Sequence, residues 1–144
     1  MPRNNQQKTK LKQAIKDGKI KNLEFRRIND VGECHTLLTV RFKDKGTADK
    51  VAKALRTKTT EKSGWHVYNN AEHLLAYRYS DGSPVVKKHA LPQTDDLLER
   101  SINLSVGVVD SGLGADFGIN ILSDDREIEK VAADFIKKVK PIVD

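Results

Sequence analysis

Residues 63–70 contain the densest group of polar and aromatic side chains in the sequence: Trp65, His66, Tyr68, Asn69 and Asn70. Aromatic rings offer apolar faces, while imidazole, hydroxyl and amide groups donate and accept hydrogen bonds. This combination suits a sugar-like ligand that is rich in hydroxyl groups. The alternative is a packed loop in which Trp65 and Tyr68 form a small satellite core.

The cysteine and the histidines show no metal-binding or nucleophile pattern. Cys34 and His35 are adjacent in a predicted strand, so their side chains point to opposite faces and cannot form a thiolate–imidazolium pair with each other. We therefore expect Cys34 to be a core residue. His66, His73 and His89 lack metal-ligand spacing such as HxxxH, so we expect no metal site.

The eighteen lysines raise the question of a Schiff-base site, which needs a desolvated amine. Nearly all of them lie on polar helix faces or in charged runs, where the ammonium stays hydrated. Lys87 and Lys88 follow an apolar stretch, and we favour a surface position for them too. Gly112 and Gly114 precede a strand and open no helix, so they do not form a phosphate cradle. We expect no catalytic and no cofactor-binding residue in this chain.

The excess positive charge lies in the first 30 residues. They contain nine Lys or Arg and three Asp or Glu, a balance of +6, whereas residues 31–144 contain seventeen of each sign. Lys8, Lys10 and Lys12 are therefore the candidates for contact with RNA, DNA or another polyanion. No aromatic side chain is interleaved among them for base stacking, so we favour a solvated helix face.

Apolar spacing predicts three helices. Two cover residues 6–17 and 47–56. The third begins after Asp124, where Glu127 completes a capping box, and ends at Pro141. Residues 57–99 are expected to be mostly irregular, with turn chemistry at residues 80–84.

Alternating apolar residues predict four strands. They lie at residues 23–25, 36–42, 101–109 and 117–121. A turn at residues 29–32 and a loop at residues 110–114 would join them as two hairpins. Ile102, Leu104, Val106 and Val108 share one side of the third strand, so we expect burial of that face only.

This order of elements predicts an α+β fold, with an antiparallel sheet of about four strands and helices packed on it. At 144 residues we expect one domain spanning residues 1–144. A composition that is 38% hydrophobic and 32% charged indicates a folded chain without membrane spans. With one cysteine and no stretch like a signal peptide, we expect a cytoplasmic protein.

Three motifs occur in order: Phe-Arg-Arg-Ile-Asn-Asp at residues 25–30, Trp-His-Val-Tyr-Asn-Asn at 65–70 and Arg-Ser-Ile-Asn-Leu-Ser at 100–105. Together with the final capped helix they resemble the C-terminal small domain of the DegT family of pyridoxal-phosphate-dependent sugar aminotransferases, which have fold type I. The similarity runs from about residue 20 to the end of the chain. It is strongest to the branch of amino-octulosonate transaminases and keto-deoxy-sugar dehydratases.

The resemblance implies only part of an enzyme. In this family the large domain supplies the Schiff-base lysine, or a histidine in the dehydratases, together with the carboxylate that pairs with the pyridine nitrogen and the phosphate-binding loop. None of these motifs occurs in the sequence. The resemblance therefore implies a detached small domain that binds no pyridoxal phosphate alone. With a large-domain partner, residues 65–70 and Arg100 would approach a nucleotide-sugar or keto-sugar substrate.

Two other functions stay open from the sequence. The basic N-terminal segment could make the chain a binding module for nucleic acid or another polyanion through Lys8, Lys10 and Lys12. Alternatively, a domain that normally covers another domain would keep an exposed apolar patch, which a homo-oligomer could bury.

Overall fold

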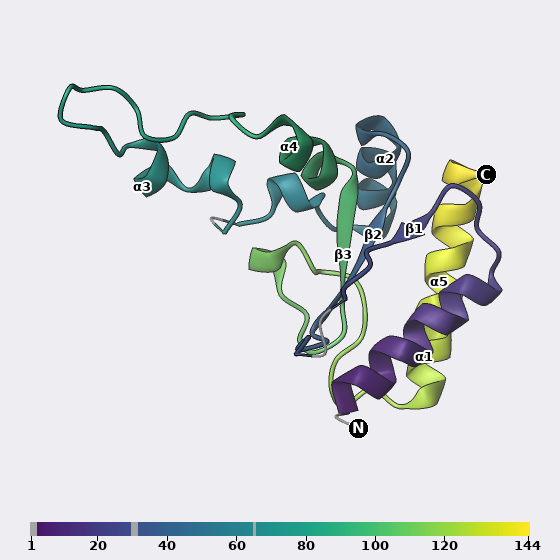
Figure 1. Ribbon diagram of the computed structural model, residues 1–144. Coiled ribbons are helices and arrows are strands. Elements are labelled where there is room, and N and C mark those ends of the chain that lie inside the picture. The colour runs from purple at the N-terminus through teal and green to yellow at the C-terminus, as the bar shows by residue number, and fades with distance from the viewer. Residues whose placement is uncertain (1–2, 30–31, 65) are drawn as a thin grey trace.

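The computed structural model describes residues 3–29, 32–64 and 66–144, which form an α+β fold around a three-stranded antiparallel sheet (Figure 1). The α-helices are α1 (Arg3–Asp17), α2 (Lys45–Leu55), α3 (Glu72–Leu75), α4 (Pro92–Glu99) and α5 (Asp125–Val143). The strands are β1 (Glu24–Phe25), β2 (Leu37–Arg41) and β3 (Ser101–Ser105). Short 3₁₀ helices are η1 (Thr60–Lys62), η2 (Tyr68–Asn70) and η3 (Ser111–Leu113).

The central strand β2 pairs antiparallel with both β1 and β3, which confirms the antiparallel sheet. Val40 lies opposite Phe25 on one side and opposite Ile102 on the other. The connection between β1 and β2 is longer than the tight turn that the sequence predicts, because pairing ends near residue 26 and resumes at residue 37. Asp30 and Val31, in the expected turn, lie outside the described residues.

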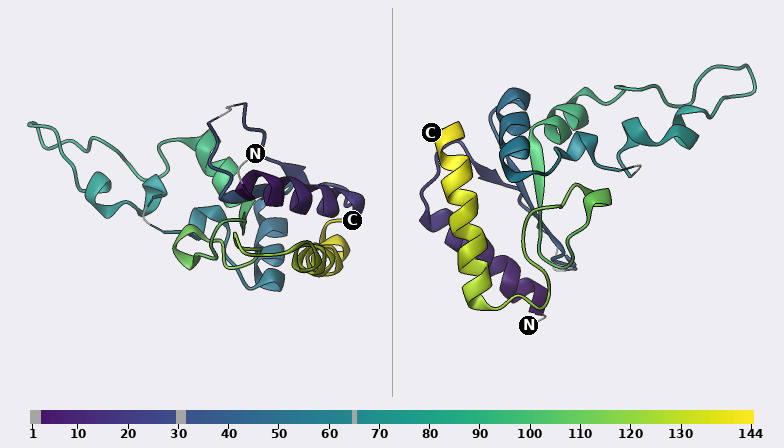
Figure 2. Two further views of the ribbon diagram at one scale, coloured as in Figure 1. Left: turned by 90° about the horizontal axis from the view of Figure 1, so that it is seen from below. Right: turned by 180° about the vertical axis from the view of Figure 1, so that it is seen from behind.

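The helices α1, α2 and α5 cover one face of the sheet. Core residues come from the even-numbered positions of the strands, such as Val40 and Ile102, and from the apolar stripes of these helices, such as Leu11, Val51 and Phe135. All five are 0% exposed. Figures 1 and 2 show α1 and α5 side by side, which agrees with the ion pair between Lys10 and Asp125.

The second face of the sheet is also covered at β3, so the expectation of a strand buried on one face only is wrong. Ser101, Asn103 and Ser105 are 3%, 6% and 0% exposed. Ser101 Oγ donates to Leu97 O at 2.5 Å, and Asn103 Nδ2 donates to Leu113 O at 3.2 Å. Helix α4 and the loop containing η3 therefore supply the cover and satisfy these buried polar groups.

The expected fourth strand and second hairpin at residues 117–121 are not formed. Gly118 makes an isolated parallel bridge to Ser105, and the Ile119 N–H donates to Ser105 O at 2.9 Å. An antiparallel bridge between Asp110 and Ala115 closes the preceding loop on itself. After this loop, residues 117–119 run alongside the end of β3 and parallel to it.

The helices differ from the sequence prediction in several places: α1 begins at Arg3 and not at residue 6, and α2 spans Lys45–Leu55 and not residues 47–56. Helix α4 lies in the region expected to be irregular and begins at Pro92, a residue suited to the first helical turn. Helix α5 is capped as expected, with Asp124 Oδ1 accepting from the Glu127 N–H at 2.8 Å. It continues through Pro141, because Val143 is only 5% exposed and its burial in the core stabilises the last turn.

Within the described ranges, none of the helices has both the length and the apolar character that a membrane crossing needs.

Candidate functional site

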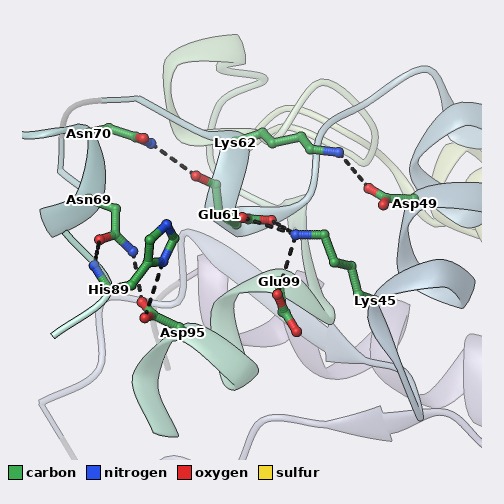
Figure 3. Close-up of polar contacts among 9 residues, drawn as sticks. All are labelled: Lys45, Asp49, Glu61, Lys62, Asn69, Asn70, His89, Asp95 and Glu99. Carbon is green, nitrogen blue, oxygen red and sulfur yellow. Dashed lines mark hydrogen bonds and ion pairs between the residues drawn. The ribbon is translucent and has the colours of Figure 1, made fainter. Parts of the chain in front are cut away.

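Asp95 organises much of the segment that the sequence singles out. Its Oδ1 atom accepts hydrogen bonds from Tyr68 Oη and from Asn69 Nδ2, both at 2.7 Å. Its Oδ2 atom lies 3.4 Å from His89 Nδ1, and the His89 N–H donates to Asn69 Oδ1 at 2.7 Å (Figure 3). The carboxylate thus links η2 to the start of α4 and to the chain that precedes α4.

These contacts shift two pKa values. Burial alone would raise the pKa of Asp95, but hydrogen bonds from Tyr68, Asn69 and His89 outweigh it and lower that pKa below its ordinary value. The pKa of the Tyr68 hydroxyl is raised by burial and then by its hydrogen bond to Asp95. Tyr68 therefore acts as a neutral donor to an ionised carboxylate.

We expect Asp95→Asn to lower stability at neutral pH, because the amide replaces an ionised acceptor of two side-chain hydrogen bonds. The folded-state pKa of Asp95 lies below the unfolded value of about 3.9, so its contribution is present above that pH and is lost as pH falls further. Urea midpoints measured at several pH values should show wild type and variant converging in acid.

Asp96→Asn is the matched control, since Asp96 follows Asp95 in α4 but its side chain is 59% exposed and paired with Arg100. A surface pair of this kind contributes little to stability. An Asp95→Asn protein as stable as the Asp96→Asn protein at neutral pH would contradict the role of Asp95.

The other predicted sugar-site residues are not brought together. Asn70 Nδ2 donates to Ser63 O at 2.8 Å, and Arg100 pairs with Asp96 and donates to Phe42 O at 3.1 Å. Trp65 lies outside the described residues. The polar groups of Tyr68, Asn69, Asn70 and Arg100 are thus engaged within the chain, which favours the packed-loop alternative for them. His66 alone of the described candidates lines the cavity described below.

The three candidate polyanion lysines do not form a row of free cations. Lys8, whose side chain is 12% exposed, pairs with Glu33, and Lys10 pairs with Asp125 at 2.5 Å. Lys12 Nζ lies 5.5 Å from the centre of the Phe25 ring. Burial lowers the pKa of Lys8, and the positive charges of Lys12 and Arg26 lower it further. Lys8 is therefore a half-buried ammonium group paired with Glu33, which the sequence pattern did not reveal.

The prediction that Cys34 is a core residue is wrong. Strand β2 begins at Leu37, so Cys34 lies in the preceding loop and its side chain is exposed. Its Sγ atom is 3.4 Å from Thr36 Oγ1. Hydrogen bonding to Thr36 lowers the pKa of the thiol, and the charge of Lys8 acts in the same direction.

A cavity of about 490 Å³ lies on the second face of the sheet, opposite the core. Its floor contains Thr39 and Asn103, whose side chains share a hydrogen bond of 2.8 Å across the strands. Other lining residues are Arg26, Arg41, His66, Leu37, Leu97, Leu98, Leu113, Lys8, Glu33, Cys34 and His35. We refer to this space as the sheet cavity and regard it as the candidate functional site.

An ion-pair network holds the elements beside the sheet cavity. Lys45 Nζ, on the first residue of α2, lies 2.9 Å from Glu61 Oε2 and 3.3 Å from Glu99 Oε2 (Figure 3). The hydrogen bond to Glu61 is the main cause of a raised pKa for Lys45. Lys62 on η1 pairs with Asp49 on α2 at 2.6 Å. These contacts fix η1 and the end of α4 relative to α2.

Comparison with known proteins adds no relative from which roles could be transferred. No protein-family model matches the chain, and no curated protein matches it. In the described part of the chain, no group of three or more His, Cys, Asp or Glu side chains is arranged to hold a metal ion. The function must therefore be argued from the sheet cavity and the surface around it.

Proposed function

We propose that this chain is the small, substrate-side domain of a pyridoxal-phosphate-dependent sugar aminotransferase-like protein, and that it acts with a partner polypeptide that holds the cofactor. One observation carries the proposal. Residues from all three motifs of the family resemblance line the sheet cavity: Arg26 from the first, His66 from the second and Asn103 from the third. Segments far apart in the sequence thus converge on one surface.

A protruding arm supports the need for a partner. Residues 76–91 extend away from the sheet and the helices that cover it (Figures 1 and 2). A bridge between Arg78 and Pro84 and a 2.9 Å hydrogen bond from Tyr79 N–H to Ser83 O give the arm its own hairpin structure. Tyr77 is 68% exposed and Tyr79 is 58% exposed. Aromatic rings presented in this way are typical of surfaces that bind another protein.

The sheet cavity and the protruding arm suggest separate roles for the partner and for this chain. Pyridoxal phosphate held by the partner would supply the imine chemistry. In this chain, His66 would orient the hydroxyl groups of a nucleotide-sugar or keto-sugar, Asn103 would form part of the floor beneath it, and the apolar wall at Leu97 and Leu98 would exclude water from one side of it.

A labelling experiment tests this proposal. The purified chain is mixed with equimolar pyridoxal phosphate, reduced with borohydride and digested for peptide mapping. We expect no lysine to be labelled stoichiometrically, because the cofactor site belongs to the partner. Lys8 is the position to inspect first, since its amine is the one that burial makes easiest to deprotonate.

Stoichiometric labelling of Lys8 that disappears in Lys8→Arg would contradict the proposal, since the imine-forming amine would then lie in this chain. Weak labelling spread over many lysines is the background that surface amines produce, and it agrees with the proposal.

A further inference from the structure

The charge balance of the sheet cavity is positive. Lys8, Arg26 and Arg41 contribute three formal positive charges to its lining, and Glu33 contributes one negative charge. Glu33 already pairs with Lys8 and lies 3.4 Å from His35 Nδ1. Within the described part of the lining, no other acidic side chain is present to neutralise the charge of Arg26, which is exposed, and of Arg41, which is half-buried.

Arg26 and Arg41 are close neighbours on the same face of the sheet. The Arg26 N–H donates to Thr39 O at 3.0 Å, which places Arg26 across from Thr39, two residues before Arg41. Such diagonal positions are about 7 to 8 Å apart in an antiparallel pair, which long side chains can span. Both guanidinium groups can thus reach one anion.

Arg41 has unused hydrogen-bonding capacity. Its Nε atom is buried and has no hydrogen-bond partner in the described structure. Glu24 is its cross-strand neighbour on the same face, and the ion pairs of the described residues include none between the two. Buried polar groups are nearly always paired, so the Arg41 Nε–H is available to donate a hydrogen bond to a ligand atom.

Part of the remaining lining is apolar. Leu37, Leu97, Leu98 and Leu113 line the cavity, and Ile28, which is 39% exposed, stands at its edge. An inorganic anion alone would leave these side chains in contact with water. A ligand that joins an oxyanion to an apolar body would satisfy both parts of the lining.

We propose that the sheet cavity binds a small organic oxyanion, a carboxylate or phosphate ester on an apolar body, with the charged group held between Arg26 and Arg41. This inference goes beyond the proposed function: it takes the same cavity as the ligand surface but names an oxyanion on an apolar body as the ligand, not a hydroxyl-rich sugar. It requires no partner, however, because every residue named belongs to this chain.

The test uses the full chain and four probes: hexanoate, hexyl phosphate, 1-hexanol and inorganic phosphate. We expect hexanoate or hexyl phosphate to shift the NMR signals of Thr39, Arg41 and Asn103. Occupancy should also slow alkylation of Cys34 by iodoacetamide, because this cysteine lines the same cavity. The preference between the two anions identifies the carboxylate or the phosphate ester as the natural group.

Variants distinguish specific binding between Arg26 and Arg41 from general attraction of anions to positive side chains. Arg26→Gln and Arg41→Gln should each weaken hexanoate or hexyl phosphate binding about tenfold, the effect of losing one charge-assisted hydrogen bond. Arg27→Gln removes the same charge from an exposed neighbour outside the cavity and should leave binding unchanged.

Equal binding of 1-hexanol and hexanoate, an equal loss in Arg27→Gln, or no shift with any probe would each overturn the inference. Any of these results leaves the labelling experiment with pyridoxal phosphate unaffected, so the two proposals fail separately.

Discussion

Gly118→Ala should destabilise the fold by about 3 kcal/mol or more, the combined cost of backbone strain and lost hydrogen bonds. An added Cβ would lie 2.3 Å from Ser105 O and 2.5 Å from Ser105 N. These are backbone atoms and cannot swing aside as a side chain could. The φ angle of +143° at Gly118 is, in addition, one that residues with a Cβ rarely adopt.

Relief of this clash would break the contact between residues 117–119 and β3. The Ser105 N–H donates to Phe117 O, and the Ile119 N–H donates to Ser105 O, both at 2.9 Å. Ile119 is 1% exposed in the core, so a shift of this segment would also disturb apolar packing. A lower urea midpoint with an unchanged m-value is the expected measurement.

Gly46→Ala is the matched control for this substitution. Gly46 lies in the first turn of α2, and its added Cβ would meet only Asp44 Oδ1, at an ordinary 3.4 Å. Alanine favours the helical conformation, so we expect a gain of up to about 0.5 kcal/mol. If Gly118→Ala were as stable as Gly46→Ala, the path of residues 117–119 along β3 would be wrong.

The elements that the sequence predicts well are those that carry their own local signals. The helices at residues 6–17 and 47–56 are confirmed, because an apolar stripe at helical spacing must face a core wherever the helix packs. The cap of α5 at Asp124 is likewise confirmed, since it depends on residues only three positions apart. Alternation also locates the paired strands β2 and β3, but the strand expected over residues 101–109 ends at Ser105, and Val108, expected on its buried face, is 69% exposed.

The errors arise where distant segments decide the outcome. Residues 117–121 alternate like a strand, but their position is set by backbone hydrogen bonds to Ser105 and Gly107 around an isolated parallel bridge. Ser101 and Asn103 are polar and look like solvent-facing positions, yet α4 and the loop at Leu113 cover them. The spacing of apolar residues in the sequence does not show that residues 117–121 lie beside β3, or that α4 packs on the second face of the sheet.

The sheet cavity could be predicted in part. Period-two alternation places Thr39, Arg41 and Asn103 on the face opposite the apolar strand residues, so a polar second face follows from the sequence alone. The walls do not follow from it. Leu97 and Leu113 reach the cavity from a helix and a loop whose positions depend on long-range packing.

Replacing both tyrosines of the arm, Tyr77→Ser with Tyr79→Ser, should weaken association with a partner at least about tenfold, since exposed aromatic side chains commonly dominate binding energy. The urea stability should change by less than about 0.5 kcal/mol, because both rings are already largely exposed. Sedimentation velocity measures association for the chain alone and mixed with a large-domain polypeptide that carries the Schiff-base lysine and pyridoxal phosphate.

Val108→Ser with Val109→Ser is the control, because these side chains are 69% and 50% exposed but lie outside the arm. If that variant loses association and the tyrosine variant does not, the arm is not the contact surface. Self-association of the unmixed chain that depends on Tyr77 and Tyr79 would instead identify a second copy as the partner. The homo-oligomeric alternative would then replace the large-domain partner. The exposed rings of Tyr77 and Tyr79 on one arm can be covered either by a second copy of the chain or by a large-domain polypeptide, but not by both at once.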